Sequence, residues 1–264
     1  MKRSMIVTAG VGLALVVAGC SSGDDAASTP GSTSKTTTAS AAPAPTMDMS
    51  SFAALPAVPA AAAATVSCEY PAAGQASKPA NAPATADVST AGTATVAMAT
   101  SQGAIGLTLD RAEAPCTVNS FVSLAEQGYF NDTPCHRLTT GSSLKVLQCG
   151  DPAGVGTGGP GYRFANEYPT TAFADGDPAV EEGMVYPRGT VAMANSGPGG
   201  TNGSQFFLVY ADSVLPPQYT VFGTIDEAGL ATLDKVAAGG TASSRGAGDG
   251  RPNSAVQIET VTVS

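Results

Sequence analysis

The strongest constraint on the fold is a set of short segments in which apolar residues alternate with small or polar ones. Residues 94–98 (Ala-Thr-Val-Ala-Met) and 105–109 (Ile-Gly-Leu-Thr-Leu) show this alternation. A period of two places successive side chains on opposite faces of an extended chain, so we expect half-buried β-strands here. Further strands are expected at 206–210, at 219–222 and across 256–263, where the alternation slips in phase.

Two helices are expected among these strands. Pro115 begins the first, because a missing backbone N–H costs nothing in the first helical turn, and Gly128 ends it. The second carries the apolar repeat at 230–236 and stops at the glycine pair 239–240. Many short strands with two helices favour a mainly β domain over residues 92–264, built as a closed barrel with helical caps.

The first twenty residues read as a targeting segment. A basic start (Met1-Lys2-Arg3) precedes an apolar run at 5–17, and Val17-Ala18-Gly19-Cys20 follows. This order resembles a bacterial lipobox, so residues 1–19 are predicted to be a lipoprotein signal peptide. A diacylglycerol-type lipid on Cys20 would anchor the protein to the cell membrane on its extracytoplasmic side. The alternative is an ordinary secretory signal or an anchor helix.

Residues 20–91 are dominated by Ala, Ser, Thr, Pro and Gly. Large apolar side chains are too sparse there to offset the entropy of ordering, so we expect a disordered tether that ends near residue 91. A flexible chain of about 70 residues reaches roughly 45 Å on average. Cys68-Glu69-Tyr70-Pro71 is an island within it, and its cysteine is a candidate for stapling the tether to the domain.

Composition excludes several functional classes. The chain has 12 Lys and Arg against 21 Asp and Glu, a formal net charge of −9, which argues against nucleic acid as a partner. His136 is the single histidine, so metal sites built from several imidazoles are excluded. We expect neither a metal nor a cofactor.

Two parts of the sequence carry chemically useful side chains. One contains His136-Arg137 and the run 146–151, and the other contains the runs 193–198 and 201–207. Together they supply an arginine, a glutamine and an asparagine with a phenylalanine and small apolar residues, and they contain no activated nucleophile. Such a set suits a site that polarises an amide and seats an apolar ring.

These motifs resemble those of the cyclophilins, which are peptidyl-prolyl cis-trans isomerases. The resemblance covers residues 93–264, and the run Asn202-Gly203-Ser204-Gln205-Phe206-Phe207 is its most diagnostic part. Other matching runs lie at 128–131, 136–137, 148–151, 158–161 and 221–223. The resemblance implies an eight-stranded antiparallel barrel capped by two helices, and proline-containing proteins or peptides as substrates. With the cysteine pattern, it is nearest to exported actinobacterial lipoprotein members.

The resemblance also implies roles for individual residues. Arg137 matches the catalytic arginine, whose guanidinium would hydrogen-bond the prolyl carbonyl and the pyramidalising nitrogen, and Gln148 would hold it in place. The matching substrate-binding positions are Val146, Ala194, Asn195, Phe207, Leu215 and Tyr219. Phe206 and Phe207 adjoin on one strand, so one of them faces the core, and the motif assigns Phe207 to the proline pocket. His136 is expected to be structural.

The sequence departs from the family pattern around the proline pocket. The spacing between His136 and Gln148 is about three residues longer than is typical, and the usual phenylalanine falls near Leu144 or Lys145. The tryptophan that many members use to bind cyclosporin falls near Val214, and the chain has no tryptophan. We therefore expect a shallower pocket, lowered isomerase activity and weak or absent cyclosporin binding.

Four cysteines remain after Cys20, and an even number in an exported chain suggests disulfides. Three pairings are possible. Cys135 and Cys149 flank the longer turn on strands expected to be antiparallel neighbours, so we favour that pair, which leaves Cys68 with Cys116. Buried free thiols are the alternative.

Three other functions compete with an isomerase. A cyclophilin-shaped groove that holds proline-containing peptides without turnover is one, and a structural envelope lipoprotein is another. A Ser-His-Asp hydrolase would use His136, but the chain has no Gly-x-Ser-x-Gly motif.

Overall fold

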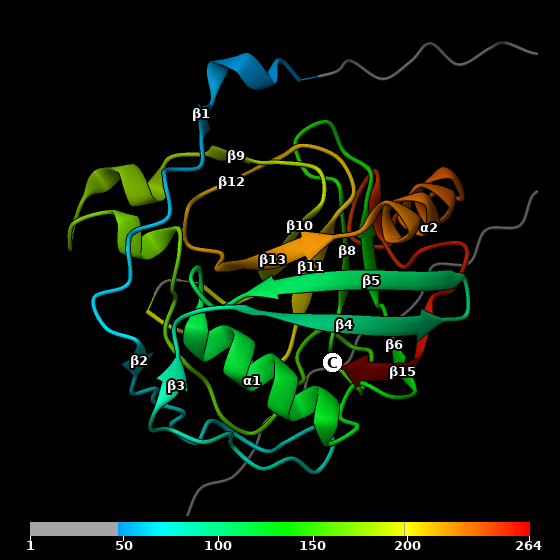
Figure 1. Cartoon of the computed structure of the whole chain (residues 1–264). Helices are drawn as coiled ribbons and strands as arrows, with labels where there is room; N and C mark the ends of the chain where they lie inside the picture. The colour runs from blue at the N-terminus through cyan, green and yellow to red at the C-terminus, as the bar shows by residue number, and fades with distance from the viewer. Residues whose placement is uncertain (1–46, 198) are drawn as a thin grey trace, which may run out of the picture. The chain divides into compact units, whose positions relative to one another are not determined.

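A curled antiparallel sheet lies at the centre of the computed structural model, which describes residues 47–197 and 199–264 (Figure 1). Its strands are hydrogen-bonded in the order β14-β7-β8-β11-β10-β13-β5-β4-β15-β6. They are β4 Thr93–Thr100, β5 Gly103–Asp110, β6 Thr133–Pro134, β7 Arg137–Thr139, β8 Val146–Cys149, β10 Thr190–Met193, β11 Phe206–Val209, β13 Val221–Ile225, β14 Asp249–Gly250 and β15 Gln257–Val263.

The chain runs directly from β6, at one end of the sheet, to β7, the second strand from the other end. Only residues 135–136 separate β6 from β7. The Cys135 N–H donates to the Val256 carbonyl (2.9 Å) beside β15, and the His136 N–H donates to the Gln148 carbonyl (3.0 Å) in β8. If β6 and β7 count as one interrupted strand and the two-residue β14 is set aside, eight strands remain, which is the number that the resemblance implies.

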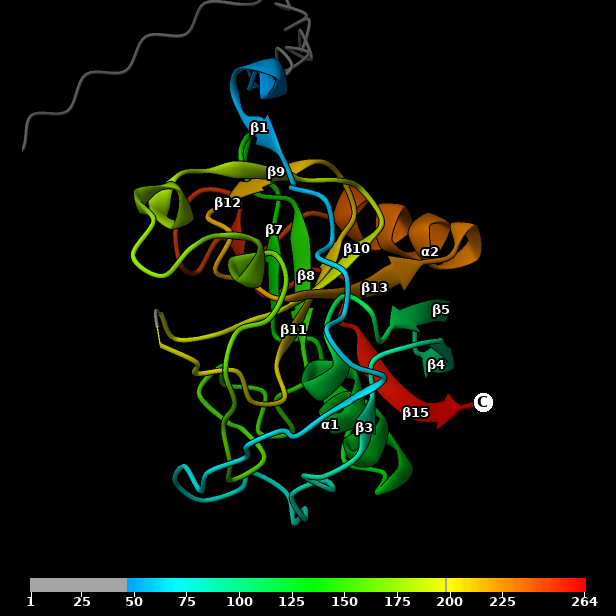
Figure 2. The same ribbon diagram turned by 60° about the vertical axis from the view of Figure 1, so that its left-hand side comes forward.

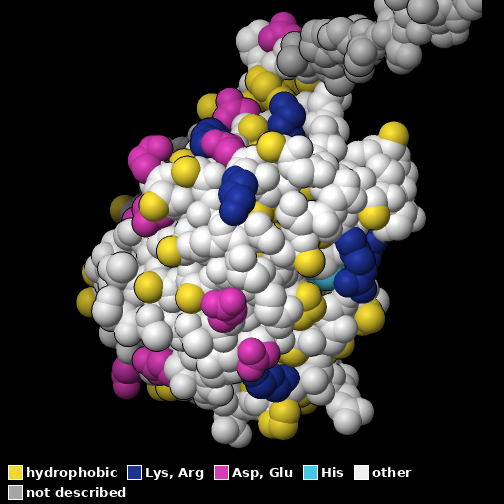
Figure 3. Space-filling model, turned by 90° about the vertical axis from the view of Figure 1, so that its right-hand side faces the viewer, with side chains coloured by type: hydrophobic (Ala, Val, Ile, Leu, Met, Phe, Trp, Pro, Cys, Tyr) yellow, Lys and Arg dark blue, Asp and Glu magenta, His cyan; other side chains and the backbone are white. Residues whose placement is uncertain are grey.

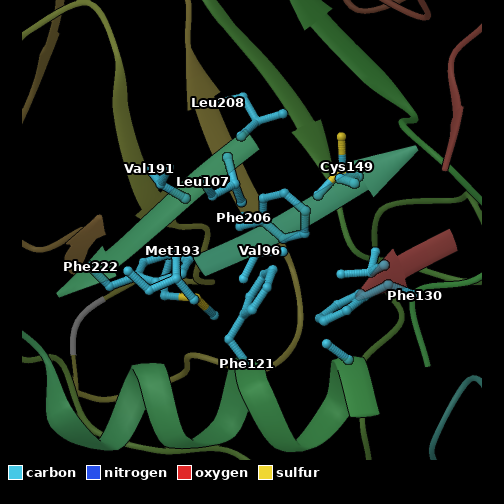
Figure 4. Close-up of a cluster of buried hydrophobic side chains, with 14 of the residues drawn as sticks. Val96, Leu107, Phe121, Phe130, Cys149, Val191, Met193, Phe206, Leu208 and Phe222 are labelled. Atoms are coloured by element: carbon cyan, nitrogen blue, oxygen red, sulfur yellow. The ribbon is translucent and has the colours of Figure 1, made fainter. Parts of the chain in front are cut away.

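One face of the sheet builds the main core. Burial alternates strictly along β4, and Ile105, Leu107 and Leu109 of β5 are buried in the same way. Aromatic rings fill the centre: Phe121 stacks on Phe130 with ring centroids 4.8 Å apart and meets Phe206 edge-on at 5.3 Å (Figure 4). The slip predicted in the last strand is a register shift in β15. The mainly β prediction is confirmed.

Both predicted helices form, as α1 Pro115–Glu126 and α2 Glu227–Ala238. Pro115 is the first residue of α1, as its missing N–H favours. The Glu167 carboxylate then accepts hydrogen bonds from the backbone N–H groups of Cys116 (3.0 Å) and Thr117 (2.7 Å). N–H groups in the first turn of a helix have no partner inside it. Glu167, 50 positions along the chain from Thr117, supplies that partner and ties the start of α1 to the rest of the domain.

Residues 47–91 belong to the folded domain, so the predicted disordered tether and the domain boundary at 92 are wrong for this part of the chain. Cys68 is buried and forms a disulfide with Cys116 in α1. The Tyr70 hydroxyl donates to the Cys116 carbonyl (2.8 Å), and Lys78 Nζ donates to the Gly128 carbonyl (2.7 Å). These anchors, one of them covalent, add to the few side chains that the segment buries in the main core, among them Tyr70 and Val88.

This segment, residues 47–91, is named the strap. It contains the 3₁₀ helix η1 Met49–Ser51 and the short strands β1 Ala53–Ala54, β2 Thr65–Val66 and β3 Val88–Ser89. β1 pairs in parallel with β9 (Met184–Tyr186), and β9 pairs with β12 (Ser213–Leu215). Figure 2 shows the strap descending from this small sheet along one side of the molecule towards β3 and α1.

The remaining elements are the 3₁₀ helices η2 Thr170–Ala172 and η3 Pro178–Glu181. Both disulfides have the expected pairing, Cys68 with Cys116 and Cys135 with Cys149. The predicted signal peptide, Cys20 and residues 21–46 lie outside the described residues. Within the described part of the chain, no helix has the length and apolar character needed to cross a membrane.

We predict that removing the Cys68–Cys116 disulfide, by Cys68→Ser with Cys116→Ser, lowers the free energy of unfolding. The bridge joins residues 48 positions apart, and closing a loop of that size corresponds to about 4 kcal/mol in the chain-entropy model. Urea unfolding measures the loss, and limited proteolysis should cut the strap faster in the variant. An unchanged unfolding midpoint would show that the other contacts hold the strap without the bridge.

Candidate active site

The site lies on the face of the sheet opposite the main core. Strand register places Arg137 opposite Gln148, Gln148 opposite Phe207, Phe207 opposite Ala192 and Ala192 opposite Val221. Residues directly opposite each other in antiparallel strands project from the same face. Five neighbouring strands therefore present one row of side chains, with a cation at one end and apolar groups at the other.

The apolar end of this row belongs to a second hydrophobic cluster, separate from the main core. Its buried members are Val146, Tyr168, Tyr186, Ala192, Ala194, Phe207, Val209, Leu215 and Val221, and Leu55, Leu144 and Tyr219 pack against it. The rings of Phe207 and Tyr219 lie 5.7 Å apart. The neighbouring Phe206 points into the main core, where Figure 4 shows it among the other aromatic rings. Five of the sequence-predicted binding residues thus come together here.

Arg137 lies at the polar end, half-buried, and three of its five N–H donors have defined partners in the protein. Its Nη1 donates to Gln148 Oε1 (3.2 Å), while Nε and Nη2 donate to the two carboxylate oxygens of Asp249 (2.8 and 2.7 Å). The hydrogen bond to Asp249 raises the pKa of Arg137 above its already high value. The same bond lowers the pKa of Asp249, so the pair is ionised at neutral pH.

A relay of amide side chains fixes Gln148 in turn. Gln148 Nε2 donates to Gln205 Oε1 (2.8 Å), and Gln205 Nε2 donates to the Gly158 carbonyl (2.9 Å). This chain of donors and acceptors fixes the amide orientation, so that an oxygen faces the guanidinium. Gln148 is therefore held in contact with Arg137, and the steadying role that the resemblance implies for it stays a prediction.

Asn195 lies where β10 has ended, at the edge of the apolar cluster. Its Nδ2 donates to the Gln218 carbonyl (2.8 Å), and its Oδ1 accepts the Gly197 N–H (3.1 Å). A groove of about 540 Å³ runs from Gln148 past Asn195. The strap contributes Ala73–Gln75 to the wall of this groove.

His136 is buried behind the site, with 3% of its surface exposed. Neither ring nitrogen has a hydrogen-bond partner among the described residues. Burial lowers its pKa, and the nearby Arg245, Arg251 and Arg137 lower it further, against an opposing contribution from Asp151. Figure 3 shows a small area in the histidine colour next to Lys and Arg side chains on that face of the molecule. With no hydroxyl paired to His136, the Ser-His-Asp arrangement is absent from the described residues.

The family to which this site belongs follows from the match of the sequence to a known family. The family described as "Cyclophilin type peptidyl-prolyl cis-trans isomerase/CLD" matches residues 95–263. The chain belongs to this family. Two relatives named "Probable peptidyl-prolyl cis-trans isomerase B" are 61% identical over 198 residues (Mycobacterium leprae) and 59% over 196 residues (Mycobacterium tuberculosis CDC 1551). Each alignment covers 74% of this chain, and they cover 66% and 63% of the respective relatives, so the chain spans just under two thirds of their length.

A solved cyclophilin has the same fold. The crystal structure of a Cryptosporidium parvum cyclophilin-type peptidyl-prolyl cis-trans isomerase in the presence of the dipeptide Ala-Pro aligns with a TM-score of 0.50 and 26% identity. The alignment covers 64% of this chain and 98% of that chain. The whole strap, residues 47–91, lies before the part matched by the family, whose first residue here is 95.

Sequence reasoning missed several residues of this cyclophilin site. Gln205 stands inside the diagnostic run, so its place near the site could have been inferred, but its bond to Gln148 could not. Asp249 follows a glycine-rich stretch with no motif of its own. Leu55 lies in the segment that the composition predicts to be a disordered tether, so no contact with the site was expected. Of Leu144 and Lys145, the two candidates for the position of the usual phenylalanine, Leu144 is the one that packs on the apolar cluster.

Within residues 47–197 and 199–264, no group of acidic, Cys or His side chains is placed to hold a metal ion.

Proposed function

We propose that this cyclophilin is a peptidyl-prolyl cis-trans isomerase that acts on proline-containing proteins outside the cytoplasmic membrane. The observation that carries the proposal is the fixed guanidinium of Arg137 in one row with the buried apolar ring of Phe207. Membership of the family and the names of the mycobacterial relatives support it.

The chemistry required is rotation about a single amide bond. Resonance across the X–Pro amide gives a barrier of about 18–20 kcal/mol, which falls when the nitrogen stops sharing its lone pair. A guanidinium carries five N–H donors, and Arg137 uses three of them for Gln148 and Asp249. Two donors remain for the substrate. They would hydrogen-bond the prolyl carbonyl and nitrogen in the twisted state, without a nucleophile.

The neighbouring groups would hold the peptide. The apolar cluster around Phe207 would take the pyrrolidine ring, which desolvates the amide and strengthens its hydrogen bonds. The backbone near Asn195 would bind the peptide on its way into the adjoining groove. The Cryptosporidium protein was crystallised in the presence of Ala-Pro, which supports a proline-containing peptide as the ligand.

A peptide-binding module with little turnover is the second candidate function. Two observations favour it. Asp249 neutralises the charge of Arg137, and Leu144 supplies an aliphatic side chain where the family pattern has an aromatic one. Both weaken groups that would act on the twisted amide, while leaving the apolar cluster and groove in place.

We predict that Arg137→Ala lowers kcat/KM on an Ala-Pro peptide by about a hundredfold, because removing a preorganised donor typically costs 10²–10³ in rate. Arg137→Lys should recover little, since one ammonium cannot reproduce the planar fork. Arg188→Ala, which removes a surface ion pair with Asp234, is the matched control and should keep the wild-type rate. Equal rates for wild type and Arg137→Ala would leave the binding module as the function.

We propose that cyclosporin binds weakly. Val214 lies in β12, and its aliphatic side chain offers no broad aromatic face there. We expect isothermal titration calorimetry to show little binding for the wild type, and Leu144→Phe to strengthen binding severalfold, because one aromatic contact contributes about 0.5–1.5 kcal/mol. A tight complex with the wild-type protein would contradict this expectation.

We propose that a lipid on Cys20 anchors the protein to the membrane. The order of basic residues, apolar run and Ala-Gly-Cys in the first twenty positions supports this. Cells fed a fatty-acid analogue should label the wild type, and Cys20→Ser should lose the label and leave the membrane fraction. Label retained by Cys20→Ser would rule out this anchor.

A further inference from the structure

We propose that Asp249 is a positioning residue for the isomerase reaction, which holds the Arg137 guanidinium in the orientation that the substrate meets. The inference rests on the proposed function. Its basis is a two-point ion pair in which both carboxylate oxygens of Asp249 accept from Nε and Nη2 of Arg137. Two parallel bonds between planar groups fix rotation as well as distance, which a single contact does not.

Strand pairing places this carboxylate. β14 pairs with β7, with Asp249 opposite Thr139 and Gly250 opposite Leu138. Arg137 and Thr139 are two positions apart on one strand, so their side chains leave the sheet on the same face. Asp249 therefore shares that face with Arg137 and reaches it diagonally across the strand pair.

The turn before Asp249 is built to hold this position. The Asp249 N–H donates to the Gly246 carbonyl (3.1 Å), and its carbonyl accepts the Arg245 N–H (2.9 Å). The Thr140 N–H binds the Gly248 carbonyl (2.7 Å), which ties the turn to β7. A Cβ at Gly250 would lie 2.7 Å from the Ser244 nitrogen, so a glycine is required for the turn to close. The carboxylate thus arrives on a fixed backbone.

The donors of the guanidinium that no protein group uses are the ones that a substrate can meet. Nε and one Nη2 hydrogen face Asp249, and one Nη1 hydrogen faces Gln148. By the planar geometry of the group, the two unused hydrogens are one on Nη1 and one on Nη2, in the guanidinium plane and off the edge that Asp249 occupies. Asp249 and Gln148 thereby fix the directions of the two donors left for the substrate. Without Asp249 the long arginine side chain regains rotamers in which that pair points elsewhere.

The chain contains a matched control pair. Arg188 also makes a two-point contact with the carboxylate of Asp234, through Nη1 and Nη2 at 2.7 and 2.8 Å, but on the surface and away from the apolar cluster. The side chains of that pair are 38% and 54% exposed, against 21% and 26% for Arg137 and Asp249. Breaking it removes an ion pair of the same chemistry without touching the site.

The test compares Asp249→Ala, Asp249→Asn and Asp234→Ala with the wild type on an Ala-Pro peptide. We expect Asp249→Ala to lower kcat by about ten- to hundredfold with KM within twofold, because a small misorientation of a catalytic group costs that much in rate. Added formate should restore part of the rate, since it returns a carboxylate to the gap. Asp249→Asn keeps one acceptor oxygen and should fall between. Asp234→Ala should keep the wild-type rate and show no response to formate.

A second measurement does not depend on turnover. The ¹⁵N–¹H signal of Arg137 Nε, assigned by its loss in Arg137→Lys, should move and exchange faster in Asp249→Ala, while circular dichroism shows an unchanged fold. A kcat equal to or above that of the wild type, a loss confined to KM, or a loss unaffected by formate with an unmoved Nε signal would each overturn the role of Asp249. Failure of the proposed function is distinguishable, because it shows as equal rates for wild type and Arg137→Ala.

Discussion

The site depends on the register of five paired strands. Because side chains alternate between the two faces of a sheet, fixing the partner of Gln148 fixes what every neighbouring strand presents beside it. Phe121 and Phe206 belong to the aromatic core on one face of the sheet. Because neighbouring residues of a strand point to opposite faces, Arg137 and Phe207 then lie in one row on the other face. A slip of one residue would bury the cation and expose the pocket.

The strap extends this architecture. β1 joins the small sheet that also holds Leu215, and Leu55 packs on the apolar cluster that contains Leu215. Further along, Ala73–Gln75 border the groove, and Cys68 is bonded to α1. A segment of tether-like composition therefore touches the pocket, the groove and the first helix. Its order comes from a covalent bond, hydrogen bonds to backbone groups and a few buried side chains such as Tyr70, which are discrete contacts and leave little mark on average hydropathy.

The electrostatics of the site combine two opposing effects. Asp249 reduces the net charge that Arg137 offers to a substrate, and it also restrains the guanidinium. For a reaction in which the amide nitrogen must be met at one angle, orientation has the larger effect, because a misdirected donor stabilises nothing. The uncharged relay through Gln148 and Gln205 adds restraint without further charge. Neutral, buried His136 leaves this balance undisturbed at physiological pH.

The sequence by itself determined the local features: the alternating strands, the start of α1 at Pro115, its end near Gly128, and the diagnostic run that ends at Phe207. Periodicity and capping act over a few residues, so they can be read along the chain. Only the tertiary structure decided that Asp249 meets Arg137 from 112 positions away, that Leu144 packs on the apolar cluster, and that the strap is ordered. Those outcomes depend on which distant segments pair, and no local pattern encodes the partner.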